Sequence, residues 1–141
     1  MNSDRAKTFL TRQLLNIVSK TVVVSIFFIV GLIELNLPLD KMVNYLPWVD
    51  GHPLWFTRIL GVVDILGASG ILIPSIFGKM PNILKWTAVG CASKQCVAIL
   101  YHSLYGVPGV IPVNLILLSF SLIIIWGAVH SRDWSKSKYR F

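Results

Sequence analysis

The chain has 141 residues, of which 55% are hydrophobic and 13% are charged, and its mean hydropathy is +0.70. Soluble domains carry about 25% charged residues, so this composition excludes an ordinary soluble domain and favours a membrane protein. The formal net charge is +7, but the basic residues border apolar segments, where they meet anionic lipid headgroups, so we expect no nucleic-acid partner.

Four apolar segments follow one another along the chain. They cover residues 17–35, 56–77, 83–105 and 111–129, and each is near the ~20 residues that a helix needs to cross the hydrocarbon core. The sequence therefore predicts an all-α membrane protein, a four-transmembrane-helix antiparallel bundle. Because these segments use most of residues 1–141, we expect a single transmembrane domain with the lipid bilayer as its main partner.

The first segment has the order of regions that a signal peptide has. A basic leader precedes TVVVSIFFIVGLI, but no small-residue cleavage site follows. We interpret the segment as a retained helix.

The longest loop is predicted at residues 36–55, on the outer side. It contains three prolines and the aromatic residues Tyr45, Trp48 and Trp55, which suit the membrane interface. A short segment from Leu39 to Leu46 is expected to lie on the surface and to cover the outer half of the bundle.

Basic residues gather on one side if the four helices alternate in direction. They are Arg5, Lys7, Arg12 and Lys20, then Lys79 and Lys85, then Arg132, Lys136, Lys138 and Arg140. The opposite side has only Lys41. The positive-inside rule therefore predicts cytoplasmic termini, a basic cytoplasmic tail at residues 130–141, and a place in a bacterial cytoplasmic (inner) membrane.

Polar residues inside the apolar segments are the candidates for a site. In segment 83–105 they recur every three or four residues, which places them on one helix face. An isolated charge in hydrocarbon is costly, so Lys94 is expected to pair with Asp64 of segment 56–77. The candidate polar pocket consists of Asp64, Lys94, Gln95, Tyr101 and His102. The pair either only fixes helix register or also serves a ligand or proton site, and the sequence leaves both open.

Other charged and reactive residues give weaker signals. Glu34 and Arg58 both fall near the outer boundary and are expected to form an ion pair there. Cys91 and Cys96 form no CxxC motif, and no residue spacing suggests a metal site or a nucleotide loop. No metal is expected, no residue is assigned a catalytic role, and any redox cofactor must be diffusible or belong to a partner.

Three stretches carry a resemblance to a known family. They are LPWVDGHPLWFTRILGVVDILGASGILIP, AILYHSLYG and NLILLSFSLIIIWG. In this order, over most of residues 20–130, they resemble the DoxX-like four-helix membrane proteins. The most specific part is Gly61 with an acid three residues later. The family often has a Lys after the glycine of its first helix and a Glu in its second, whereas this chain has Glu34 after Gly31, Asp64 in the second, and its cation at Lys94.

The resemblance implies a function class rather than a reaction. Family members resemble the small membrane subunit of thiosulfate:quinone oxidoreductase, and a eukaryotic branch acts in receptor assembly. The first hypothesis is therefore a membrane subunit associated with quinone-linked redox metabolism and with a redox protein partner. Its quinone-type ligand would lie between segments 56–77 and 83–105 below the first loop, with its polar head toward His102 and Lys94 and its tail leaving past Gly67 and Ala68. The alternatives are an assembly factor or scaffold, and a small proton-coupled exporter working as a homo-oligomer.

The charge distribution gives a first testable prediction. A cysteine introduced at Asn44 should react with a membrane-impermeant maleimide in intact cells, and one at Ser137 should react only after permeabilisation. The chain with only Cys91 and Cys96 is the background control. Labelling of the Ser137 variant from outside intact cells would contradict the orientation.

Overall fold

The computed structural model describes residues 3–105 and 108–137, and within these residues the chain is helical and contains no strand. The elements are α1 (Ser3–Asn36), α2 (Leu39–Met42), the 3-10 helix η1 (Pro47–Val49), α3 (Leu54–Phe77), α4 (Pro81–Tyr105), the 3-10 helix η2 (Pro108–Val110) and α5 (Ile111–Ser137).

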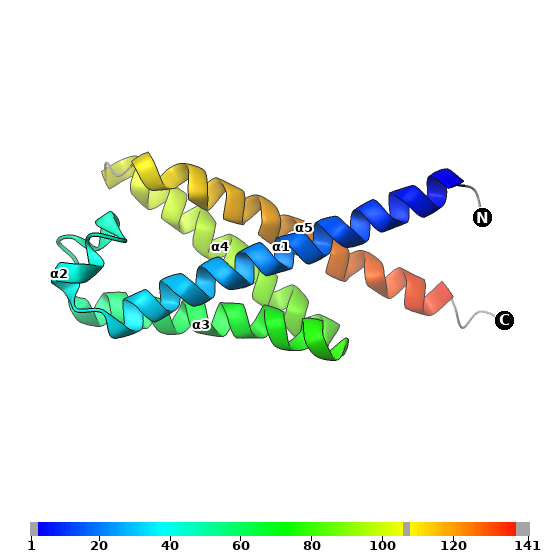
Figure 1. Cartoon of the computed structure of the whole chain (residues 1–141), viewed down its shortest axis with the longest axis horizontal. Coiled ribbons are helices and arrows are strands. Elements are labelled where there is room, and N and C mark those ends of the chain that lie inside the picture. Colours follow the sequence, from blue (N-terminus) through cyan, green and yellow to red (C-terminus); the bar gives the residue numbers. More distant parts are fainter. Residues whose placement is uncertain (1–2, 106–107, 138–141) are drawn as a thin grey trace.

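The long helices pack as a ring in which each has two principal neighbours. α1 packs against α3 and α5, and α4 packs against the same two helices from the other side. Figure 1 shows that α1 begins and α5 ends at one end of the molecule, whereas α2 lies at the opposite end. The segment that joins α1 to α3, residues 37–53, therefore covers one end of the bundle; we call it the outer segment.

Three helical stretches in the described part of the chain are long and apolar enough to cross a membrane. They are Lys7–Asn36, Leu54–Phe77 and Pro108–His130. α4 has sufficient length, with 25 residues, but its polar side chains keep it below the apolarity of the other three. The number of membrane crossings and the side on which the termini lie stay predictions.

The helices are longer than the apolar segments from which they were predicted. α1 begins at Ser3 rather than at residue 17, and α5 continues to Ser137, so most of the predicted basic tail at residues 130–141 is helical. Residues 138–141 of that tail lie outside the described residues. The helices extend beyond the apolar segments because hydropathy marks only the part of a helix that lies in lipid, whereas lysine and arginine also favour a helix in water. The predicted loop at residues 36–55 likewise contains α2 and η1.

The tightest contact between α1 and α3 lies where two glycines meet. A Cβ atom on Gly31 would lie 3.0 Å from the carbonyl oxygen of Gly61, and one on Gly61 would lie 2.9 Å from Cβ of Glu34. Small residues let membrane helices approach closely, and packing must hold them together because lipid is as apolar as the side chains. This contact sets α1 and α3 in register one helical turn above Asp64.

The opposite half of the bundle is joined by apolar packing and a few polar contacts. Val23, Ile71 and Ile124 are fully buried in the main core. Asn16 of α1 donates from Nδ2 to the carbonyl oxygen of Ile123, at 3.3 Å. The core therefore occupies the half of the bundle that is remote from the outer segment, and polar groups collect in the other half.

The outer segment is anchored rather than free. Its residues Met42 and Val49 are fully buried, and Arg58 of α3 donates to the carbonyl oxygens of Glu34 and Leu37, at 2.6 and 3.0 Å. Those oxygens lie at the end of α1, where helix carbonyls lack intrahelical partners and attract a cation. The segment thus closes over the end of the bundle as a cover.

The glycine contact gives the second prediction. Gly61→Ala should lower thermal stability in detergent by about 1–3 kcal/mol, because the added methyl group meets α1 at less than van der Waals distance. Gly90→Ala is the matched control, since a Cβ atom there meets nothing within 4 Å and alanine favours a helix. Equal losses in both variants would show that the α1–α3 contact is not tight.

Candidate functional site

A cavity of about 360 Å³ lies beneath the outer segment, inside the ring of long helices. Its size lies within the range of about 300–1,000 Å³ that small-molecule sites have. Its wall is mostly apolar, with polar side chains from several elements. The polar members and the amphipathic aromatic ones are Glu34, Tyr45, Trp48, His52, Asp64, Lys94, Gln95, Tyr101, His102 and Asn114.

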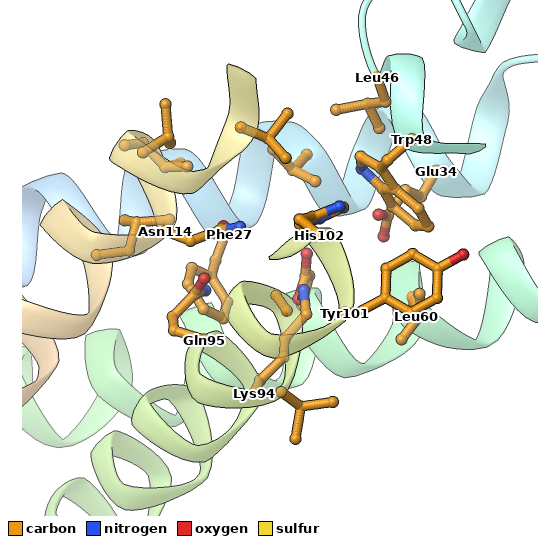
Figure 2. Close-up of a pocket in the computed structure, with 18 of the residues that line it drawn as sticks. Phe27, Glu34, Leu46, Trp48, Leu60, Lys94, Gln95, Tyr101, His102 and Asn114 are labelled. Carbon is orange, nitrogen blue, oxygen red and sulfur yellow. Dashed lines mark hydrogen bonds and ion pairs between the residues drawn. The ribbon is translucent and has the colours of Figure 1, made fainter. Parts of the chain in front are cut away.

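All five residues of the predicted polar pocket lie on this wall. Lys94, Gln95, Tyr101 and His102 come from one face of α4, and Asp64 comes from α3. Figure 2 shows the labelled side chains of α4 directed into the space between the helices, with Glu34 and Trp48 on its far side. The spacing of three and four residues explains why α4 presents them together.

An ion pair joins α3 to α4 at the wall of the cavity. The Lys94 ammonium donates to Oδ1 of Asp64 and lies 5.1 Å from the ring centroid of Phe27 on α1. The side chain of Asp64 is 2% exposed and that of Lys94 is 25% exposed. The carboxylate is thus sealed inside the protein, and the cation that neutralises it also holds the ring of a third helix.

The predicted ion pair between Glu34 and Arg58 is not formed. The Arg58 guanidinium binds the backbone carbonyls of Glu34 and Leu37 instead, and the Glu34 carboxyl group points into the cavity, fully buried. The physical reason is the end of α1, whose free carbonyl oxygens compete successfully for the guanidinium. Glu34 belongs to the candidate site and not to a boundary pair.

Several buried polar atoms on the wall have no hydrogen-bond partner among the described residues. They are both carboxyl oxygens of Glu34, Oε1 of Gln95 and Nδ1 of His102. Burying a polar atom without a partner costs about 1–3 kcal/mol, so a fold rarely retains such a cluster. Atoms of this kind on the wall of a cavity are those that a bound ligand would satisfy.

Two residues of the outer segment complete the polar end of the cavity. The Tyr101 hydroxyl group and Nε2 of His52 share a hydrogen bond of 2.8 Å, and the rings of Trp48 and His102 meet edge to face with centroids 6.4 Å apart. Trp48, His52 and Asn114 also line the wall and were not predicted from the sequence as members of the site. Asn114 gave a usable signal, as a lone amide in an apolar segment, whereas the loop residues gave none.

The cavity reaches the surface of the bundle at several wall residues. Val97 of α4, Val113 of α5 and Tyr45 of the outer segment are 67%, 48% and 65% exposed, and Phe56 of α3 is 36% exposed. The predicted exit past Gly67 and Ala68 is wrong. Ala68 is buried, and a Cβ atom on Gly67 would lie 3.1 Å from the sulfur of Cys91, so the helices are closed there.

Metal chemistry has no obvious place among the described residues. No group of three or more His, Cys, Asp or Glu side chains there could hold an ion. Cys91 is buried and Cys96 is exposed, and both are free thiols. The cavity can instead hold an uncharged or singly charged organic molecule. An aromatic ring of such a molecule would lie among the aromatic side chains, and its polar atoms would face α1 and α4.

Comparison with known proteins decides the family. Residues 18–124 match the model of the DoxX-like family. The chain belongs to the DoxX-like family. No curated protein and no solved structure matches it. Family membership and the three apolar helices together make this DoxX-like protein an integral membrane protein.

The ion pair gives the third prediction, which is asymmetric. Lys94→Met should cost about 3–5 kcal/mol of stability in detergent, because it strands the sealed carboxylate of Asp64. Asp64→Asn should cost less, because the partly exposed ammonium can move outward on its flexible stem. The double substitution to Met and Asn should cost less than the sum of the two losses. Additive losses in this cycle would mean that the two residues are not energetically coupled.

Proposed function

We propose that this DoxX-like protein is a small membrane subunit that binds the headgroup of a lipid-soluble quinone in its cavity and serves a membrane-bound redox partner. The observation that carries the proposal is the composition of the wall. It joins a large apolar surface to a group of polar side chains, and it includes exposed apolar residues such as Val97, past which the tail of a ligand would reach lipid. A molecule with an apolar tail and a ring bearing two oxygens suits such a site.

The membrane arrangement that we propose has four crossings. α4 has 25 residues, about 37 Å at 1.5 Å per residue, which is enough to cross the hydrocarbon core. Its polar residues Gln95 and His102 are buried within the bundle, so they need not meet lipid. The basic end of the molecule faces the cytoplasm of a bacterial cell, and the cavity then lies in the outer leaflet.

The wall offers groups for each part of the ligand. The indole of Trp48 and the ring of Phe56 give flat surfaces for a six-membered ring, and the apolar residues Leu60 and Val97 line the way to lipid. Gln95 and His102 supply hydrogen-bonding atoms on the part of the wall that α4 forms. A quinone of the membrane would therefore enter sideways from lipid, with its headgroup ending beneath the outer segment.

A second function is favoured by Glu34 alone. A buried carboxyl group that has no hydrogen-bond partner among the described residues and shares a cavity wall with aromatic rings also suits an organic cation, as a small proton-coupled exporter would require. Such an exporter would need a homo-oligomer to enclose a path. A scaffold for assembly of another membrane protein would not need the polar cavity at all. Binding of a quinone supports the redox subunit, binding of a lipophilic ammonium ion supports the exporter, and binding of neither supports the scaffold.

Ligand binding gives the fourth prediction. Tetramethylbenzoquinone should raise the melting temperature of the purified protein, and His102→Ala should weaken its binding roughly tenfold while changing the stability of the free protein little. The side chain lines an existing cavity and Nδ1 has no partner, so its removal strands no buried group.

The entrance supplies matched controls for the same measurement. Val97→Trp should block access and weaken binding, whereas Leu100→Trp on the same helix should not, because Leu100 is 61% exposed and lies off the wall. If tetramethylbenzoquinone leaves the melting temperature unchanged while a lipophilic ammonium raises it, the exporter hypothesis replaces the quinone hypothesis. If neither compound binds, the scaffold remains.

A further inference from the structure

The unpartnered atoms of the cavity wall are mostly hydrogen-bond acceptors. Of the four buried atoms there without a partner among the described residues, three are oxygens, two on Glu34 and one on Gln95. An amide oxygen accepts only. A carboxylate accepts through both oxygens, and even a protonated carboxyl group retains a carbonyl acceptor. The fourth atom, Nδ1 of His102, donates or accepts according to its tautomer.

Two donors of the wall are already engaged. The Lys94 ammonium donates to Asp64 and lies over the ring of Phe27, and the Tyr101 hydroxyl group shares its hydrogen bond with His52. The wall also has amide and indole N–H donors, on Gln95, Asn114 and Trp48, so it suits a ligand group that both donates and accepts. A ligand that only accepts hydrogen bonds would leave the Glu34 and Gln95 oxygens unsatisfied, at the full cost of their burial.

The two redox forms of a quinone differ in this property. The oxidised ring carries two carbonyl oxygens, which only accept, whereas the reduced ring carries two hydroxyl groups, each of which donates one hydrogen bond. The shape and the apolar surface of the two forms are nearly the same. Discrimination between them thus depends on the hydrogen-bonding atoms of the wall, where an unmatched polar group is heavily penalised.

Glu34 has no structural task that would explain its position. The Arg58 guanidinium uses the backbone carbonyl of Glu34 and would keep it with any side chain. The Cβ atom of Glu34 packs against Gly61, which again requires no carboxyl group. The side chain is nevertheless fully buried and faces the cavity. A costly group with no hydrogen-bond partner among the described residues indicates a partner outside the fold.

We infer that the cavity binds the reduced, hydroquinone form of its ligand in preference to the quinone, and that the Glu34 carboxyl group accepts a hydrogen bond from a ligand hydroxyl group. Gln95 Oε1 is the second acceptor. The inference rests on the proposed function, because it assigns a redox form to the ligand class proposed above. Its consequence is that binding raises the reduction potential of the bound couple.

The test measures the binding of three ring compounds to the whole protein in detergent, under anaerobic conditions. Tetramethylbenzoquinone and its hydroquinone have nearly the same shape. The third compound is the dimethyl ether of that hydroquinone, which has no hydroxyl donor and carries two additional methyl groups. The hydroquinone should bind roughly tenfold more tightly than the quinone, and the dimethyl ether should bind no better than the quinone. A tenfold preference corresponds to a rise of about 30 mV in the potential of this two-electron couple.

Substitution of Glu34 assigns the preference to its carboxyl group. Glu34→Leu should bring the two dissociation constants to within about threefold of each other, while the melting temperature of the free protein stays equal or rises, since a buried unpartnered polar group is removed. Glu34→Gln keeps one acceptor oxygen and the length of the side chain, and should retain part of the preference. Val30→Ile, on the same helix and the same wall, should change the binding of both forms alike.

The outcomes separate the inference from the proposed function. Equal or tighter binding of the quinone by the unaltered protein overturns the inference and leaves the proposed function in place. A preference that survives Glu34→Leu overturns the role of Glu34. Binding of none of the three compounds overturns the proposed function and the inference with it.

Discussion

The ion pair between Asp64 and Lys94 is the constraint on which the rest of the polar half depends. Two charged side chains inside the helix bundle are tolerated only because they form an ion pair, and this pair holds α3 and α4 in one register. The Phe27 ring over the ammonium extends the same constraint to α1. With three helices held there, the side chains above the pair keep a defined arrangement around an open space.

Glu34 and Asp64 show how differently one fold can treat two buried carboxyl groups. Asp64 has a cation from the neighbouring helix, whereas Glu34 has no partner among the described residues, although Arg58 lies close enough to bind its backbone. The guanidinium instead stabilises the end of α1 and holds the outer segment. A structural role alone would be met by an apolar residue at position 34, so the two acids divide into one that supports the bundle and one that faces the cavity.

Much of this arrangement follows from local sequence patterns. The polar spacing in α4 was sufficient to place Gln95 and His102 on one face, because a helix in lipid must turn such residues inward. The orientation of the Glu34 carboxyl group toward the cavity could not be predicted from the sequence. The positions of two residues along their helices do not show whether a guanidinium will bind a side chain or free backbone carbonyls. The contributions of Trp48 and His52 depend on how the outer segment folds back, and a loop carries no periodicity from which that could be read.

The cavity persists because packing contacts beside it and above it hold its walls in place. Beside it, small residues let α1 and α3 pack at Gly31 and Gly61, so the helices cannot approach further without backbone contact. Above, the outer segment is held by buried Met42 and by Arg58, which prevents it from sinking between the helices. The space between these two fixed points cannot collapse to satisfy the polar atoms on its wall. The fold therefore keeps these buried polar atoms at a cost in stability, which is the cost expected of a preorganised binding site.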